Sequence, residues 1–457
     1  MFFDLIGILS LPVDLLTISL WRAIVRFALP YMFAYLLQVL YGLADLYVIG
    51  LYCNVASTTA VANGAQVMHG LTAVIIALSV GSTVCIARSV GAGDVEAQRL
   101  SLCNSITLFS GLGVVLAVGM LLVVDPLIGA MDVPVEAVGE TADYLTICFA
   151  GLPLIVLYNV VAAVYRGLGD TQRPLLFVVI ACLINIGLDF LFIGALDFGT
   201  VGAAWSTVLA QAVSVVVALL FIWRKTSIGP LGLNCFRLRR RVVGDILRIG
   251  TPVALQDGCI QFSFMLIMVI ANGRGVVDAA AVGIVEKFIG ILFIVPSAML
   301  ATTSTIVAQC LGAGLERRGR LTLYRALLIS VSFGLLMTAT FQVVPEWAVG
   351  IFTDDDSVIF KGADYLRGYV LDCVLAGVHF CFSGYFTALG KSYISFAHNI
   401  AAIVTARLPL AYLASELYPD TLFPMGIATC TGSLVSVVIC LVVYWYLTHN
   451  HTQRQRV

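Results

Sequence analysis

Charge is what this sequence has least of. Only 11% of its 457 residues are Asp, Glu, Lys or Arg, whereas 60% are hydrophobic and the mean hydropathy is +1.02. Soluble proteins average about 25% charged residues, so a soluble globular chain is excluded. The formal net charge is −1 and no basic domain stands apart. A broad electrostatic attraction to nucleic acid is therefore excluded as well.

Motifs for catalysis and metal binding are also missing. The twelve cysteines contain no Cys-x-x-Cys pair, so we interpret them as small buried apolar residues. Neither HExxH nor GxSxG occurs. The stretch "GYFTALGKS" at 384–392 has five residues between its glycines, where a phosphate-binding loop needs four. We therefore expect no enzyme, no cofactor and no resident metal ion.

Long apolar runs are what the sequence has instead. A helix needs about 20 mostly apolar residues to span a bilayer. Twelve runs qualify, separated by Gly, Pro, Asp or Arg: 27–51, 57–88, 98–124, 137–165, 174–195, 199–223, 245–271, 277–310, 321–344, 363–389, 393–416 and 422–447. They predict an all-α integral membrane protein. The amphipathic start at 1–26 lacks the basic n-region of a signal peptide, and we interpret it as an interfacial helix.

Lysine and arginine predict the orientation. They gather before 27–51, in alternate loops, in the link at 224–244 and at the C-terminus, whereas the opposite loops offer little beyond Arg274 and Lys361. By the positive-inside rule both termini face the cytoplasm.

The chain contains an internal repeat. "VGAGD" at 90–94 is answered by "LGAGL" at 311–315, "ADYL" at 142–145 by the same letters at 363–366, and "GLGDT" at 167–171 by "ALGKS" at 388–392. Each offset is 221 residues. We predict two repeated six-helix bundles: an N-terminal bundle at 1–225, a cytoplasmic linker at 226–244 and a C-terminal bundle at 245–457. Transporters commonly bind substrate between such repeats.

The acidic residues inside the apolar runs differ between the two copies. Asp45, Asn185 and Asp189 lie in the first copy, and the repeat places Ile267, Ala406 and Leu410 at the equivalent positions of the second. An ionisable residue deep in a membrane costs roughly 2.5–3.5 kcal/mol on insertion scales. Asn185 and Asp189 share one helix face, and Thr207 is a plausible polar partner. We hypothesise a site for H+ or Na+; the alternative is a purely structural hydrogen-bonded contact.

The sequence resembles the multidrug and toxic compound extrusion (MATE) transporters over almost its whole length. The resemblance is carried by "ALP…LADLYVIG", "SVGAGD", "YRGLGDTQRPL", "LINIGLDFLFIG" and "GTVGAAWSTVLAQ", in that order. It implies two six-helix bundles in a V, with a cavity that opens alternately to each side. In the DinF-like branch, which we favour, the residues matching Asp45, Asn185 and Asp189 line a cation pocket in the N-terminal lobe. Tyr41 fits that pattern, Thr207 fits it more loosely, and Pro30 matches a proline at which the first span bends.

A second acidic set leaves the location of the ion site open. Asp257, Glu286 and Asp372 lie in the three runs where the NorM-like branch carries acidic residues, but their surroundings do not align cleanly. Glu286 and Asp372 are expected either to line a cavity in the C-terminal lobe or to be structural. Lys287 follows Glu286 directly and is expected to neutralise part of its charge. Arg407 resembles an arginine of the family, with an interhelical hydrogen-bonding role as the alternative.

These observations together predict secondary active efflux. We expect antiport of small amphipathic or cationic organic substrates against H+ or Na+, by alternating access, in a monomer of the plasma (inner) membrane surrounded by lipid. The alternative is a lipid or lipid-linked oligosaccharide flippase of the same superfamily. Flippases usually carry a strongly cationic cavity, and this sequence offers few cations inside its apolar runs beyond Lys287 and Arg407.

Overall fold

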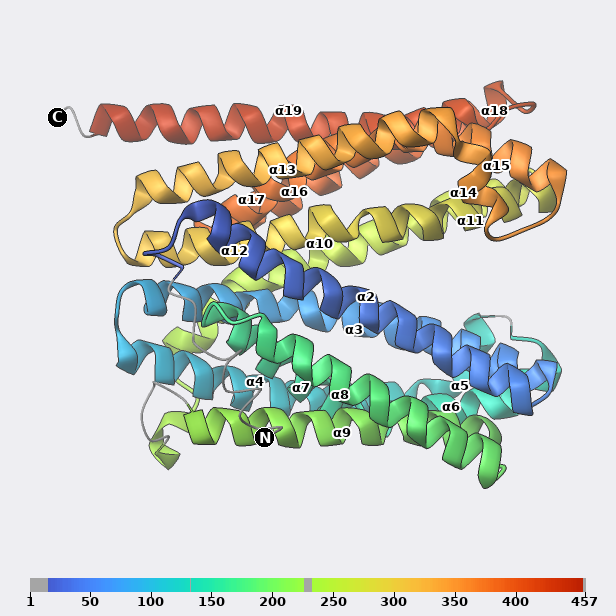
Figure 1. Cartoon of the computed structure of the whole chain (residues 1–457), viewed down its shortest axis with the longest axis horizontal. Helices are drawn as coiled ribbons and strands as arrows, with labels where there is room; N and C mark the ends of the chain where they lie inside the picture. The colour runs from blue at the N-terminus through green and yellow to red at the C-terminus, as the bar shows by residue number, and fades with distance from the viewer. Residues whose placement is uncertain (1–14, 132, 226–231, 455–457) are drawn as a thin grey trace. The chain divides into compact units, whose positions relative to one another are not determined.

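The computed structural model describes residues 15–131, 133–225 and 232–454, and these ranges contain helices and no strand (Figure 1). The chain divides into two compact units. The first ends at Ala254 and includes Gly312–Gly314, and the second holds the other residues from Leu255 onward. This division falls inside α10 (Arg240–Gly273). The predicted bundle boundaries at 225 and 245 stay a prediction.

The first unit is built from long helices that pack through small residues. Gly64 of α3 lies directly against the ring of Tyr144 in α6, so that a Cβ atom there would overlap the ring. Small residues of this kind let membrane helices approach closely. The elements before α10 are α2 (Leu20–Tyr52), α3 (Val55–Gly91), α4 (Val95–Leu122), α5 (Val124–Ala130), η1 (Val135–Ala137), α6 (Val138–Ala150), α7 (Leu152–Gly167), α8 (Gln172–Asp189), the π-helical η2 (Phe190–Ala195), α9 (Gly199–Lys225) and η3 (Leu233–Phe236).

The second unit repeats this construction. Gly368 of α15 and Gly426 of α19 bring two backbones into contact, beside the fully buried rings of Tyr365 and Tyr369. Its elements after α10 are α11 (Val276–Leu292), α12 (Ile294–Gly312), α13 (Glu316–Val343), α14 (Pro345–Gly350), α15 (Asp356–Tyr369), α16 (Asp372–Ala388), α17 (Ser392–Ala402), the π-helical η4 (Ile403–Arg407), α18 (Leu408–Leu417) and α19 (Phe423–Arg454).

The twelve predicted spans are confirmed, although two of them are broken. Within the described residues ten helical spans are long and apolar enough to cross a membrane, and two bent helix pairs bring the number to twelve. The pair α6–α7 bends by 51° and the pair α15–α16 by 43°. Pro153 explains the first break, because its ring cannot continue the preceding helix. At the second break the carbonyl of Val370 accepts hydrogen bonds from the Cys373 N–H at 3.0 Å and from the Thr338 hydroxyl at 3.2 Å.

Glycines in the left-handed backbone conformation explain why the motifs are repeated. Gly93 and Gly314 have φ angles of 66° and 72°, and Gly169 and Gly390 have 85° and 74°. Each pair is 221 residues apart and follows the end of a helix. Glycine is favoured there because a Cβ atom disfavours positive φ.

The predicted interfacial helix and the predicted linker differ from the structure in their boundaries. The predicted interfacial helix lies largely outside the described residues, and its last part, from Leu20, already belongs to α2. Residues 226–231 of the predicted linker are also outside them. The rest of the linker is tied to α4: the Asn104 amide donates to the Cys235 carbonyl at 3.3 Å and accepts from the Arg239 N–H at 2.7 Å.

Candidate functional site

Three helices of the first unit bring the predicted polar residues together. Asp45 lies on α2, Asn185 and Asp189 lie one turn apart on α8, and Thr207 lies on α9. Asp189, Asn185 and Thr207 all face the Asp45 carboxylate. Asn185 and Asp189 have no exposed surface, and Asp45 is 6% exposed. These side chains therefore form one buried cluster.

The cluster has few hydrogen bonds of its own. The Thr207 hydroxyl donates to Asp45 Oδ2 at 3.5 Å and to the Ala203 carbonyl at 3.1 Å. Within the described part of the chain, Asp45 Oδ1, both Asp189 carboxylate oxygens and both amide atoms of Asn185 are buried without a hydrogen-bond partner. Buried polar groups are normally satisfied, because each orphaned one costs about 1–3 kcal/mol and a charged one more. The oxygens left over are the ligand type that a hard cation or a proton requires.

The end of α8 helps to place Asp189. This residue is the last of α8, and the π-helical η2 follows it directly. The Leu196 N–H donates to the Leu191 carbonyl at 2.9 Å, a wider helical turn than in an α-helix. Such π-helical turns are rare in proteins overall, but those that occur often lie at functional sites.

Tyr41 lies beside the cluster, together with Gln211 and Tyr144, which the sequence analysis did not single out. Tyr41 lies near Asp45, Cys148 and the Gln211 side chain, and Tyr144 of α6 lies near the same group. Gln211 follows Thr207 by four residues, so the shared helix face could have revealed it. Tyr144 could not be found in this way, because its approach depends on Gly64.

Pro30 lies inside α2, which runs without interruption from Leu20 to Tyr52. A proline in a helix removes one backbone hydrogen bond and weakens the helix locally. Asp45 lies fifteen residues farther along the same helix, so a rearrangement at Pro30 would move the segment that carries it.

The second unit holds a different acidic cluster. Tyr365 and Tyr369 of α15 donate to the two Glu286 oxygens at 3.1 and 3.5 Å. Arg407 donates to the Tyr369 hydroxyl at 2.9 Å, and its guanidinium lies 4.6 Å from the centre of the Phe264 ring. Both Glu286 and Asp372 lie within electrostatic reach of Arg407. Asp257 is not among the neighbours of this group.

The two clusters differ in their resident cation. Arg407 is 8% exposed, and Gly432 of α19 makes room for its side chain. Lys287, which was expected to offset the charge of Glu286, is instead exposed on another side of α11, because neighbouring residues of a helix point in different directions. Among the described residues the acids of neither cluster form an ion pair within 4.0 Å. Each cluster thus contains two acids, but only the second has an arginine within electrostatic reach of them.

Comparison with known proteins decides the family. A family model described as MatE matches residues 30–191 and again residues 252–413, so the two matches begin 222 residues apart. The chain belongs to the MATE family. The double match agrees with the repeat read from the sequence, and MATE proteins are membrane transporters rather than enzymes.

Individual MATE relatives match over most of their length. The chain is 23% identical to "Probable multidrug resistance protein YpnP" of Bacillus subtilis, covering 86% of this chain and 88% of the relative. It is 22% identical to "Multidrug export protein MepA" of Staphylococcus aureus (strain NCTC 8325 / PS 47), covering 93% of each. The solved structure of a MATE "in the bent conformation" is similar with a TM-score of 0.91 and 25% identity, over 98% of this chain and 100% of the other.

Proposed function

We propose that this MATE transporter is a secondary active exporter of small amphipathic, often cationic, organic compounds, driven by H+ or Na+ that binds at Asp45, Asn185 and Asp189. The observation that carries the proposal is the buried pair Asp45 and Asp189, which has no cation of the protein beside it in the described ranges. The substrate class rests on the names of relatives, which describe multidrug resistance and multidrug export.

The cluster chemistry suits either driving ion. A proton would bind one carboxylate and let it donate a hydrogen bond to the other. Na+ would use the carboxylate oxygens and the Asn185 carbonyl oxygen, with the hydroxyls of Thr207 and Tyr41 close by. In both cases one positive charge offsets part of the cost of two carboxylates in a membrane.

Ion binding is coupled to substrate release through α2. With both acids ionised, Asp45 on α2 and Asp189 on α8 repel each other. A bound cation removes the repulsion and favours a closer arrangement of the two helices. Pro30 is the weak point at which α2 responds, and the rearranged helix narrows the space for substrate. A ligand can shift two states only through different affinities for them, and the cluster supplies that difference.

Several further features belong to the same proposal. We place the protein in the DinF-like branch, because its ion cluster is in the N-terminal lobe. We place it in the plasma membrane as a monomer with both termini in the cytoplasm, because its cations gather in the loops on that side.

Efflux from proteoliposomes tests the proposal. A fluorescent organic cation is loaded, and its release is followed under a pH gradient or a Na+ gradient, applied separately. Wild type should respond to at least one gradient, and D45N and D189N should lose the response while remaining folded. D355N is the matched control, because Asp355 is exposed and asparagine also caps helices well.

Two results would contradict the proposal. If D189N transports normally, the ion site is elsewhere, and the Glu286 cluster becomes the next candidate. If wild type moves no organic cation under either gradient, the flippase alternative gains, and scrambling of a labelled lipid in the same vesicles becomes the deciding assay.

A further inference from the structure

Arg166 lies near the end of α7 without an acidic partner. Among the residues that the structure describes it forms no ion pair, and its electrostatic neighbours are the hydroxyls of Tyr31 and Tyr158. Its guanidinium carbon lies 5.9 Å from the centre of the Tyr31 ring. The last turn of a helix favours a cation, and stacking on an aromatic ring also stabilises it. Neither interaction uses all five N–H donors of the group.

A second arginine nearby shows the alternative arrangement. Arg173, at the start of α8, stacks on Tyr165 at 5.4 Å and is also paired with Asp170 at 3.2 Å. Both arginines therefore have an aromatic ring, but only Arg173 has a carboxylate. In the described part of the chain, Arg166 therefore lacks the kind of anion that Asp170 supplies to Arg173.

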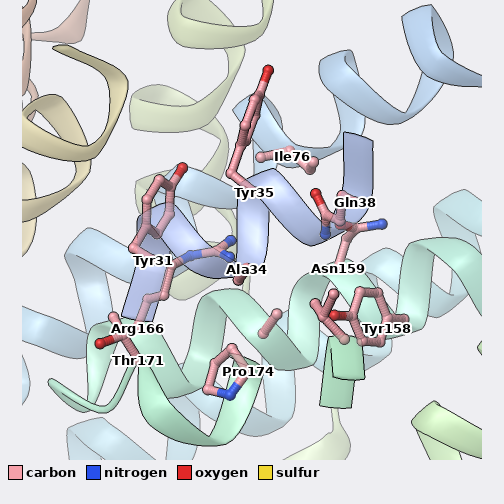
Figure 2. A pocket seen from close by; sticks show the side chains of 12 residues that line it. Tyr31, Ala34, Tyr35, Gln38, Ile76, Tyr158, Asn159, Arg166, Thr171 and Pro174 are labelled. Carbon is pink, nitrogen blue, oxygen red and sulfur yellow. The ribbon is translucent and has the colours of Figure 1, made fainter. Parts of the chain in front are cut away.

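The Arg166 side chain borders a pocket between α2, α3, α7 and α8 (Figure 2). The pocket has a volume of about 60 Å³, several times the roughly 10–15 Å³ that one water needs. Amide and hydroxyl groups of Gln38, Asn159 and Tyr158 line it together with the apolar side chains of Ile76 and Pro174. Such a pocket has room for a small charged group but not for a whole drug-sized molecule.

Asp45 cannot serve as the missing anion. The residues of α2 that line the pocket run from Tyr31 to Gln38, which are 14 and 7 residues before Asp45. At a rise of 1.5 Å per residue, this places the pocket about 10–20 Å along the helix from Asp45. The helix thus passes a cationic pocket first and the acidic cluster two to four turns later.

We propose that this pocket binds the anionic group of an amphipathic molecule, a carboxylate or a phosphate, with Arg166 as its ion-pair partner. Gln38 and Tyr158 donate further hydrogen bonds, and the apolar part of the molecule lies against Ile76 and Pro174. The site adds anionic and zwitterionic amphiphiles to the cationic compounds of the proposed function. It does not depend on the driving ion, so a binding experiment tests it separately from efflux.

The probe is 4-(1-pyrenyl)butanoate, with its uncharged methyl ester as the chemical control. The full-length protein is placed in nanodiscs of phosphatidylcholine, and binding is followed by fluorescence anisotropy, with empty nanodiscs as the blank. The R166Q variant should bind the acid at least tenfold more weakly than wild type and the ester equally well. R166K should lose less, because lysine keeps the charge but not the fork of donors. R367Q is the matched control: Arg367 pairs with Glu346 at 2.6 Å in the second unit, and its loss should change nothing.

Equal affinity of wild type and R166Q for the acid overturns the proposal, as does equal loss of acid and ester binding. If R166Q does not fold, R166K and Y31L decide: the acid must bind more weakly to both, with the ester unchanged. Nanodiscs containing phosphatidylglycerol distinguish the two sources of the anion. Competition with the probe, weakened in R166K, identifies a lipid headgroup, whereas probe binding that is indifferent to phosphatidylglycerol identifies a soluble organic acid.

Discussion

Replacing Asp189 by asparagine should change how the stability of the protein depends on ions. Asp189 is fully buried, and both of its carboxylate oxygens lack a hydrogen-bond partner in the described structure. Asparagine has nearly the same shape and carries no charge. The D189N variant therefore removes one of two repelling carboxylates without leaving a cavity, which makes charge the main variable.

The expected magnitude follows from the cost of burying charge. An ionised carboxylate at the centre of a membrane helix costs roughly 2.5–3.5 kcal/mol on insertion scales. Wild type recovers part of this cost when a cation binds, because an ion at 100 times its dissociation constant stabilises the folded state by about 2.7 kcal/mol. Wild type should therefore be least stable at alkaline pH in K+ buffer, and should gain up to about 3 kcal/mol from its driving ion. Without the ion, D189N should be more stable than wild type, and it should gain little stability when the ion is added.

Thermal unfolding in detergent measures this difference. Most of the free cysteines are buried, so a dye that becomes fluorescent on reaction with thiols reports unfolding. Wild type, D189N and D372N are compared at pH 8 and pH 6, each in NaCl and in KCl. D372N is the matched control, since Asp372 is also buried but lies in the lobe that holds Arg407. It should keep the wild-type ion response. A D189N variant that gains as much stability from Na+ or from acid as wild type would refute the reasoning.

Four further substitutions test other parts of the structure by thermal unfolding. R407Q should destabilise the protein by about 1.5–3 kcal/mol, because it removes a charged hydrogen bond to the Tyr369 hydroxyl and a cation within electrostatic reach of Glu286 and Asp372, and unchanged stability would contradict that assignment. R274K should cost about 2–4 kcal/mol and expose the loop at 415–421 to proteases: the Arg274 side chain donates to Asp278 at 2.7 Å and to several carbonyls of that loop, a fork that lysine cannot reproduce. G93A should cost about 1–2 kcal/mol through its positive φ angle alone, since a Cβ atom there meets nothing within 4 Å. G111A, in open space within α4, should instead stabilise the helix by about 0.5–1 kcal/mol.

The features that could be predicted from the sequence are those that depend on residues close together in the chain. The spans follow from the apolar length that a bilayer requires, and the repeat shows in motifs whose glycines adopt positive φ angles. Asp45, Asn185 and Asp189 were visible because polar residues are costly inside apolar runs. The break at Gly151 had a signal in Pro153, although the sequence reading passed over it.

The features that could not be predicted depend on packing between helices distant in sequence. Tyr365 and Tyr369 share a helix face, but nothing in the sequence shows that they donate to Glu286, 79 and 83 residues away. Lys287 was the obvious neighbour for that carboxylate by sequence. Arg407 takes this place because α11, α15 and η4 meet in the folded second unit. Sequence proximity was a poor guide there, since adjacent helix residues face different directions.

The comparison of the two lobes also explains why we propose an ion site in the first lobe alone. Each cluster contains two acids and lies beside a π-helical segment: Asp189 precedes η2, and Arg407 ends η4. In the second lobe Arg407 is a permanent counter-ion, so its acids need no exchangeable cation. In the first lobe Asn185 contributes no charge, so in the proposed site neutrality comes from a cation bound from outside the protein. A cation that must be acquired can also be released, and that is what coupling requires. The R407Q variant tests this directly. If Arg407 is what prevents ion binding in the second lobe, its removal should make the stability of that lobe depend on ions. This dependence should persist in the R407Q/D189N double variant.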